Sequence, residues 1–337
     1  MNADEIYQRL LKPSDALVAD IAKLDGDIII LGVGGKMGPA LATLAKQAID
    51  IAGVRKKVIG VARFSEPSLE KELKQNGIIT YSADLLEDDQ LSQLPDVTNV
   101  LYLAGMKFGT TGKESLTWAM NSYLPGRVAE KYKHSKIVAF STGNVYPFTT
   151  PASGGPTEQH AVEPIGEYAQ SCLGRERMFQ YFSTKNQTPV LIYRLNYAND
   201  VSYGVLLDIA RAVKERRPID LRMGYVNIIW QGEANEMAIR CLHHCSVPAK
   251  ILNIAGPEIL SVRTLAEEFG SLFNEKPVFV NEEQNTALLS NAKESYRLFG
   301  EPNVRLSDMI SLIARWVDEG LKTLSKPTHF QERQGKF

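Results

Sequence analysis

The segment YAQSCLGRER at residues 168–177 places a tyrosine where it could take part in acid–base chemistry. It follows a strand-like STGNVYP at 141–147 and, further upstream, a glycine turn GVGGKMG at 32–38. In that context a tyrosine, three residues and then a lysine are typical of proton transfer beside a nicotinamide cofactor. The fourth residue after Tyr168 is Cys172, which supplies no positive charge. The pattern therefore predicts an oxidoreductase scaffold in which one catalytic group is replaced.

The missing lysine matters because of the ordinary pKa of tyrosine. An unperturbed tyrosine has a pKa of about 10, so about one phenol in a thousand is ionised at pH 7. If Tyr168 acts as a base, ionising its phenol at pH 7 costs about 4 kcal/mol. If it acts as an acid, it uses the neutral phenol that is already present. Arg175, two helical turns along the same face, and Lys107, at a neighbouring strand end, could each supply the charge. The sequence leaves both candidates open.

Three glycines form a candidate phosphate-binding turn. Gly32, Gly35 and Gly38 follow an apolar β-branched run and precede a segment with helical spacing. Glycine permits a tight turn and lets backbone N–H groups approach a pyrophosphate, whose charge a helix N-terminus favours. Lys36 and Met37 belong to the same turn, and we assign all five residues to cofactor binding. An ordinary strand-to-helix turn is the alternative interpretation.

The end of the second expected strand bears on the choice between the two nicotinamide cofactors. An acidic side chain there would accept a hydrogen bond from the ribose 2′-hydroxyl, but the chain has Ala62 followed by Arg63. A guanidinium suits a 2′-phosphate. We therefore expect NADP to be favoured over NAD, with a solvated loop residue as the alternative interpretation of Arg63.

Composition narrows the class of protein. A hydrophobic fraction of 44% and a charged fraction of 23% in 337 residues are ordinary for a soluble globular protein with a large core. A net charge of −1 without a basic block points to no nucleic-acid or membrane partner. The mixed N-terminal sequence does not resemble a signal peptide, no apolar run approaches membrane-spanning length, and three cysteines suit a reducing compartment. We therefore expect a cytoplasmic protein.

The segment CLHHC at residues 241–245 could suggest a metal site. Cys241 and Cys245 lie one turn apart on an expected helix, where they fit as small apolar fillers. The sequence has no second pair of ligands with zinc-like spacing after them. We therefore expect no metal site.

Short apolar runs alternate with helical segments along the first 196 residues. The expected strands are 27–35 with its glycine turn, 58–64, 77–85, 99–105, 136–142 and 189–196. Strands and helices that alternate at this spacing predict an α/β fold with a Rossmann-like, doubly wound parallel sheet.

The pattern changes after about residue 196, where strands become short and helices dominate. Helical spacing recurs at 261–273, 285–300 and 306–321. We predict a dinucleotide-binding lobe at 1–195, which begins with a helical extension, and a smaller, mainly helical substrate lobe at 196–325. The tail at 326–337 is either poorly ordered or a docking arm.

Over about residues 25–320 the chain resembles the extended short-chain dehydrogenases/reductases, the NAD(P)-dependent sugar epimerase/dehydratase group. The resemblance rests on the glycine turn, on STGNVYP, and on EPIGEYAQSCLGRE at 163–176, which matches P-x-x-x-Y-x-x-S-K-x-x-x-E except at the lysine. It implies hydride transfer by nicotinamide and proton transfer by Tyr168. Thr142 then takes the catalytic Ser/Thr position, which holds the substrate oxygen.

The resemblance implies further cofactor contacts from the ends of the third and fourth strands and from a following helix: Asp84, Leu85, Ala104, Gly105, Lys107 and Asn121. Asp84 would touch the adenine, and Asn121 matches a structural asparagine. The expected substrate residues are Asn144, Asn196 and Trp230. A core position is the alternative for Trp230.

Two functions from different classes remain open. The first is an NAD(P)-dependent oxidoreductase, epimerase or dehydratase that acts on a sugar or nucleotide-sugar-like hydroxy compound, which the retained Thr142 and Tyr168 support. The second is a catalytically impaired NAD(P)-binding regulatory or structural protein, which Cys172 supports.

The expected partners are a small, sugar-like substrate and a second copy of the chain. The resemblance implies a homodimer built partly on the helices that carry Asn121 and Tyr168. Aromatic side chains on the Tyr168 helix, namely Phe179, Tyr181 and Phe182, belong either to the core or to that interface.

Overall fold

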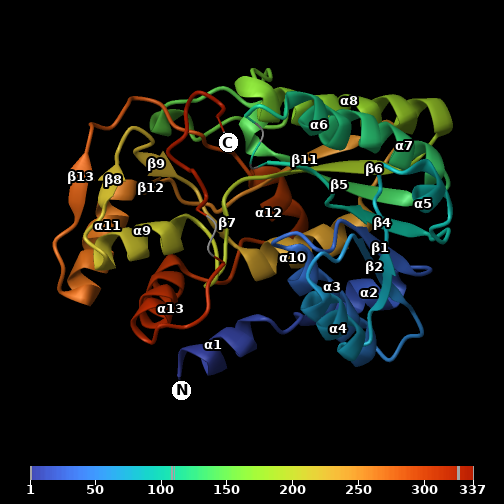
Figure 1. Ribbon diagram of the computed structural model, residues 1–337, viewed down its shortest axis with the longest axis horizontal. Coiled ribbons are helices and arrows are strands. Elements are labelled where there is room, and N and C mark those ends of the chain that lie inside the picture. Colours follow the sequence, from blue (N-terminus) through green and yellow to red (C-terminus); the bar gives the residue numbers. More distant parts are fainter. Residues whose placement is uncertain (1, 108, 110, 325–326, 337) are drawn as a thin grey trace.

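The computed structural model describes residues 2–107, 109, 111–324 and 327–336. Its centre is a seven-stranded sheet in the spatial order β11-β6-β5-β4-β1-β2-β3, in which neighbouring strands are parallel (Figure 1). The strands are β1 (Ile28–Leu31), β2 (Val58–Ala62), β3 (Ile79–Ser82), β4 (Asn99–Tyr102), β5 (Lys136–Thr142), β6 (Val190–Leu195) and β11 (Lys250–Ile254). The predicted Rossmann-like sheet is confirmed, and all six expected strands belong to it.

Helices cover both faces of the sheet because alternate side chains of each buried strand point to opposite sides. On β1, Ile28 and Ile30 join the core on one face, whereas Ile29 and Leu31 join the core on the other. The first face carries α2 (Asp15–Lys23), α3 (Gly38–Ile51), α4 (Pro67–Gln75) and α10 (Gln231–Arg240). The second carries α5 (Asp88–Ser92), α6 (Glu114–Trp118), a π-helical turn (Ala119–Tyr123), α7 (Leu124–Lys131) and α8 (Gly166–Asn186).

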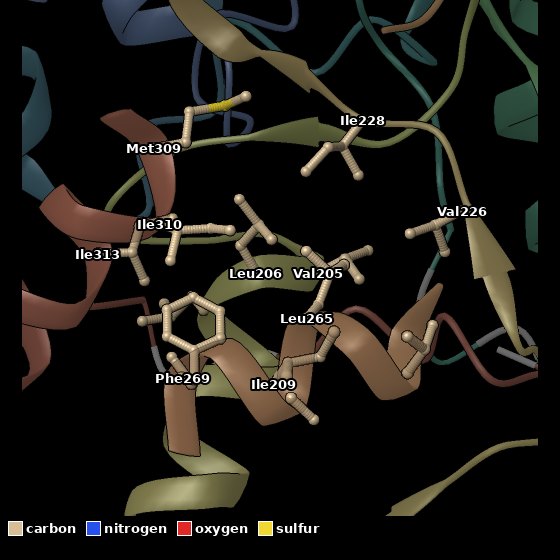
Figure 2. Close-up of a cluster of buried hydrophobic side chains, with 14 of the residues drawn as sticks. Val205, Leu206, Ile209, Val226, Ile228, Leu265, Phe269, Met309, Ile310 and Ile313 are labelled. Carbon is tan, nitrogen blue, oxygen red and sulfur yellow. The ribbon is translucent and has the colours of Figure 1, made fainter. Parts of the chain in front are cut away.

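The second lobe has its own core, which Figure 2 shows. Leucine, isoleucine, valine and phenylalanine side chains from three helices meet there, as expected for amphipathic helices that share one interior. The helices of this part of the chain are α1 (Ala3–Leu10), α9 (Val205–Lys214), α11 (Val262–Phe273) and α13 (Leu306–Asp318), and α12 (Lys293–Phe299) packs beside β11. The mainly helical C-terminal part is therefore confirmed.

Short strand pairs and 3-10 turns complete the chain. The pairs are β7 (Ala198–Asn199) with β10 (Ile229–Trp230), β8 (Pro218–Asp220) with β13 (Val278–Val280), and β9 (Tyr225–Val226) with β12 (Leu260–Ser261). The 3-10 turns are Gly143–Val145, Pro151–Ser153 and Cys241–His243. Among the described residues, none of the helices combines the length and the apolar character that a bilayer span requires.

The C-terminal segment 327–336 runs back over the molecule, and its last described residues lie between the sheet and the second lobe (Figure 1). Phe330 is 4% exposed and belongs to the core of the second lobe. Of the two expectations for the tail, the structure thus shows a docked arm, which packs on its own chain.

Candidate active site

Most of the residues expected to bind a cofactor follow the ends of β1, β2, β3 and β4, and the expected catalytic Thr142 ends β5. Because these strands are parallel, their carboxyl ends lie along one edge of the sheet. The strand order places β1 beside β4, with β2 and β3 on one side and β5 and β6 on the other. At such a switch point the loops after the two strands diverge and leave a crevice for a ligand.

The glycine turn has the shape that a dinucleotide requires. Gly32 has a φ of +91°, and a Cβ built on it would lie 2.7 Å from the backbone nitrogen of Ala104, so the turn and the end of β4 pack backbone to backbone. A Cβ on Gly38 would lie 2.3 Å from the carbonyl oxygen of Val33, which brings the start of α3 against the strand. Gly35 is different, because it is exposed and its Cβ would meet the Gly32 carbonyl oxygen at 3.4 Å.

The N-terminus of α3 faces the same turn. Met37 occupies its N-cap position, and a thioether is a poor acceptor for the N–H groups of the first turn. Together with the open backbone at Gly35, these N–H groups fit a pyrophosphate. The Nζ of Lys36 lies 3.4 Å from the ring centroid of Tyr203, so this side chain connects the turn to the second lobe. A phosphate contact by Lys36 stays a prediction.

The ends of β2 and β3 bring Arg63 beside Asp84. The side chain of Arg63 is 75% exposed, and its Nη1 lies 3.8 Å from Oδ2 of Asp84. Asp84 also accepts a hydrogen bond from the backbone N–H of Leu86 at 3.0 Å, while Leu85 is buried. The sequence has no carboxylate at the end of β2, but the fold brings the carboxylate of Asp84 there from the end of β3.

Arg175, one of the two cations that could supply the charge of the expected lysine, ties α8 to β5 and to the π-helical turn. Its Nη1 donates to the carbonyl oxygen of Phe140 and its Nη2 donates to Oδ1 of Asn121, each at 2.7 Å. Asn121 also pairs with the backbone N–H and carbonyl oxygen of Met106, both at 2.8 Å. A Cβ on Gly105 would lie 2.3 Å from Nη2 of Arg175, so glycine is needed above the guanidinium.

Tyr168 lies in the first turn of α8 and is 8% exposed, with the side chains of Thr142 and Cys172 close enough to affect the protonation of its hydroxyl. Oγ1 of Thr142, at the end of β5, accepts hydrogen bonds from the backbone and side-chain amides of Asn144, at 3.2 and 2.9 Å. Burial first, and then the Cys172 sulfur, raise the pKa of Tyr168 well above its ordinary value, while Arg175 and Thr142 oppose this rise. The phenol is therefore neutral at physiological pH.

Cys172, at the position where the sequence motif leads us to expect a lysine, lies one helical turn after Tyr168 and is completely buried. Burial raises the pKa of its thiol, against the opposing charge of Arg175. The side chain is thus a neutral thiol at physiological pH. It cannot stabilise a tyrosinate as an ammonium group would.

Lys107 reaches the same phenol from the loop after β4. Its Nζ lies 5.7 Å from the ring centroid of Tyr168, within the range of a cation–π contact. The side chain is half-buried, and burial lowers the pKa of Lys107 to about 8. The amine is therefore mostly protonated at pH 7 and supplies a positive charge beside Tyr168.

The sequence profile of the NAD dependent epimerase/dehydratase family matches residues 28–218, which is more than half of the chain. The chain belongs to this family. The predicted membership, and with it the prediction of an NAD-dependent type of enzyme, is confirmed. No curated protein sequence matches the chain.

Solved structures of family enzymes share the fold. The UDP-glucuronic acid 4-epimerase of Bacillus cereus in complex with NAD is 17% identical, with a TM-score of 0.71 over 88% of this chain and 100% of that one. The UDP-glucose 4-epimerase of Thermotoga maritima with UDP-glucose is 15% identical, with a TM-score of 0.70 over 87% and 99%. An epimerase from Methanothermobacter thermautotrophicus is 17% identical, with a TM-score of 0.72 over 91% and 96%.

The three residues expected to face a substrate of this family member differ in their surroundings. Asn144 is half-buried and lines a small cavity beside Tyr146. Asn196 is 2% exposed, and its Nδ2 donates to Oδ1 of Asn227 at 3.0 Å. Trp230 is 1% exposed and belongs to the core of the second lobe, which is the alternative that the sequence left open for it.

A buried ion pair behind the site was not singled out from the sequence. Nη2 and Nε of Arg194, on β6, donate to the carboxylate of Glu176, on α8, at 2.6 and 2.9 Å. The same carboxylate accepts a hydrogen bond from Ser141 at 2.5 Å, and Arg194 also donates to the hydroxyl of Tyr146 at 2.6 Å. The pair fixes α8, which carries Tyr168, against β5 and β6. Glu176 closes the family motif, and that match was the available signal.

Proposed function

We propose that the chain binds a nicotinamide dinucleotide along the carboxyl ends of β1, β2 and β4 and acts on a nucleotide sugar by proton transfer through Tyr168. One observation supports this proposal most directly. The Tyr168 hydroxyl lies close enough to the Thr142 side chain for its protonation to be affected, and the amine of Lys107 lies beside its ring. The pair of hydroxyl groups and the cation lie at the edge of the sheet where the glycine turn opens.

The residues present fit the cofactor. The backbone around Gly35 and the N-terminus of α3 would hold the pyrophosphate, and Asp84 would bind at the adenosine end. When bound, the nicotinamide supplies the hydride chemistry of the family. NAD and NADP are the two candidates, and Arg63 is the side chain that favours NADP.

Tyr168 is suited to give a proton rather than to take one. Its raised pKa keeps the phenol neutral, so the proton is already present when a substrate oxygen gains charge. Thr142 lies within hydrogen-bonding reach of the same hydroxyl and would hold that oxygen in place. The reverse reaction requires a tyrosinate, which needs a nearby positive charge at neutral pH.

We propose that Lys107 supplies this charge together with Arg175, which already lowers the pKa of Tyr168. Both terminal nitrogens of Arg175 bind oxygen atoms of Phe140 and Asn121 that hold the fold together. Lys107 comes from a loop, lies over the Tyr168 ring, and has a pKa of about 8. Its charge is present below pH 8 and is lost as the pH rises through that value, so tyrosinate chemistry should weaken above pH 8.

The proposed substrate class rests on the similar structures. Two of them are 4-epimerases whose names specify UDP-glucuronic acid and UDP-glucose, and the second contains UDP-glucose. Their folds cover nearly the whole of this chain. A UDP-hexose is therefore the first substrate to test.

Substitution of Tyr168 and Lys107 tests this mechanism. With UDP-glucose and UDP-glucuronic acid as substrates, Tyr168→Phe should lower kcat at least about 100-fold, because a positioned general acid contributes about that much. Lys107→Met should lower kcat about tenfold at pH 7 and remove the decrease in activity above pH 8. Full turnover by Tyr168→Phe would show that the proton comes from another group.

A regulatory or structural role without catalysis is the second candidate, and Cys172 favours it. Cys172 is a buried neutral thiol beside Tyr168, so it does not provide the positive charge that would stabilise the tyrosinate. The two functions differ in one measurement. A protein that binds NAD or NADP with Tyr168 and Lys107 intact, but epimerises neither UDP-sugar at pH 6 to 9, fits the second function.

A further inference from the structure

The segment 327–336 is anchored to the second lobe at its beginning. The backbone N–H and the hydroxyl of Thr328 both donate to Oδ2 of Asp208, on α9, at 2.8 and 2.6 Å. Two residues later, Phe330 packs into the core with 4% of its surface exposed. This half of the segment is therefore part of the fold.

The other half, residues 332–336, leaves that core and crosses towards the sheet. The guanidinium of Arg333 donates to the carbonyl oxygen and hydroxyl of Thr286, at 2.8 and 2.7 Å, and to the carbonyl oxygen of Arg222 at 3.2 Å. Its Cζ also lies 4.2 Å from the ring centroid of Phe148, in the loop that follows Thr142. Arg333 therefore connects the second lobe to the catalytic strand end of the first.

The segment then meets the start of the catalytic helix. A Cβ built on Gly166, at the start of α8, would lie 2.6 Å from the carbonyl oxygen of Gly335, and a Cβ on Gly335 would lie 2.3 Å from that of Ile165. The backbones touch only because both positions are glycine. This contact is two residues before Tyr168.

A small cavity lies beside residues 332–336 and the expected substrate residue Asn144. The cavity there has a volume of about 10 Å³ and is lined by Asn144, Tyr146, Phe148, Ile165, Leu288, Glu332 and Gly335. About 10–15 Å³ is needed to hold one water molecule, whereas a pocket for a small organic ligand has about 300 Å³ or more. A larger cavity of about 400 Å³ lies between α9, β8 and residues 327–331, and Asn144 is not among its described lining residues.

We propose that residues 332–336 are a strap that fills the substrate side of the site and must leave before a nucleotide sugar binds. The proposal rests on the proposed function, because it concerns the regulation of the same site. Docking of the strap and binding of the sugar then exclude each other, so the apparent affinity is reduced by the fraction of molecules with the strap released. Phe330 keeps the segment attached when the strap opens.

Two variants open the strap without touching its anchor. A chain that ends at Gln331 retains Thr328 and Phe330 but lacks the strap. Gly335→Ala places a methyl group against the carbonyl oxygen of Ile165 and should undock the tip. Gly320→Ala is the matched control, because it has a similar positive φ of +64° but open space around its Cβ.

The experiment measures the binding of UDP-glucose and UDP-glucuronic acid to the NAD-loaded protein by calorimetry. The shortened chain and Gly335→Ala should bind at least one of them about tenfold more tightly than the full chain, and Gly320→Ala should behave like the full chain. Equal affinity in all four proteins would overturn the strap and leave the proposed substrate class standing.

If none of the four proteins binds either sugar while all bind NAD, the proposed substrate class fails. Hydrogen exchange then tests whether the strap opens. A strap that opens locally exchanges the amides of residues 332–336 many times faster than those of α9. Exchange of both regions at the same slow rate would show a fixed part of the fold and overturn the proposal.

Discussion

If Cys172 stands where the family motif has a lysine, the replacement affects the protonation of the site more than its shape. The sulfur is buried on α8 beside Tyr168. What is lost is the positive charge that would lower the pKa of the phenol. A site of this kind would favour donation of a proton, and the opposite step would depend on the proposed charges of Lys107 and Arg175.

Restoring the charge by Cys172→Lys should lower the pKa of Tyr168 and shift the pH optimum of any tyrosinate-dependent activity downwards. The new ammonium would lie between Arg175 and Lys107 in a buried place, so we expect a loss of stability of about 1–3 kcal/mol. Tyrosinate absorbance during a pH titration and urea unfolding measure the two effects. Cys172→Met separates charge from size, and an equal pKa of Tyr168 in both variants would contradict this interpretation.

Arg63 tests the choice of cofactor. If its guanidinium binds a 2′-phosphate, NADPH binds more tightly than NADH, and Arg63→Ala should reduce the difference about tenfold, equivalent to about 1.4 kcal/mol. Asp84, 3.8 Å from the guanidinium, would favour NADH once the arginine is removed. Calorimetry with both cofactors measures this preference, and equal affinities that the substitution leaves unchanged would refute it.

At the scale of the elements, local patterns predicted the sheet because each buried strand is a short apolar run bounded by glycine or polar residues. The place of β11 in the sheet is harder to predict from local sequence, because its residue Leu252 pairs with Tyr193 on β6, about sixty positions earlier. The expected lobe boundary at residue 195 stays a prediction, and β11 and α10 return to the first lobe after it.

The segment 285–300 shows where helical spacing misleads. A helix was expected throughout, but α12 begins at Lys293. Ala287 instead forms a bridge with Thr149, and Leu288 and Leu289 are buried in extended chain. Their apolar side chains fill the core of the second lobe, so tertiary packing overrides the local preference.

In the candidate site, helical spacing in the sequence predicts which residues lie near Tyr168 on α8. The strap at 332–336 depends on long-range contacts, which the spacing of residues in the sequence does not encode.

The glycine turn permits a prediction about the element that binds the cofactor. Gly35→Val should weaken binding of NAD and NADP at least about tenfold without unfolding the chain, because the open backbone there would be covered by a branched side chain. Gly32→Ala should instead lower the melting temperature, because its methyl group would meet the backbone of Ala104. Fluorescence titration and thermal melting separate the two effects, and unchanged binding in a folded Gly35→Val would show that the turn is misassigned.

At the scale of the whole molecule, several contacts tie the two lobes together around the site. Lys36 of the glycine turn lies on Tyr203 before α9, and Arg333 crosses to Phe148. Because these contacts lie beside expected cofactor or substrate positions, binding in the crevice and the relative placement of the lobes should be coupled.

The outer face of α6, the π-helical turn and α8 carries exposed aromatic side chains, whereas Phe179 on α8 is buried in the core. Trp118 is 38% exposed, Tyr123 58% and Tyr181 57%, on helices that lie side by side (Figure 1). Exposed apolar residues gathered on one face indicate an interface. We therefore propose a second copy of this chain as the partner.

Sedimentation velocity should therefore give twice the chain mass of 37.4 kDa at micromolar concentration. The double substitution Tyr123→Glu and Tyr181→Glu places four charges across a two-fold interface and should shift the protein to the monomer mass, since like charges at a buried contact cost several kcal/mol. Leu272→Glu, at a 52% exposed position on α11 in the other lobe, is the control and should leave the dimer intact. A monomeric native chain, or a dimer that survives the double substitution, would place the interface elsewhere or remove it.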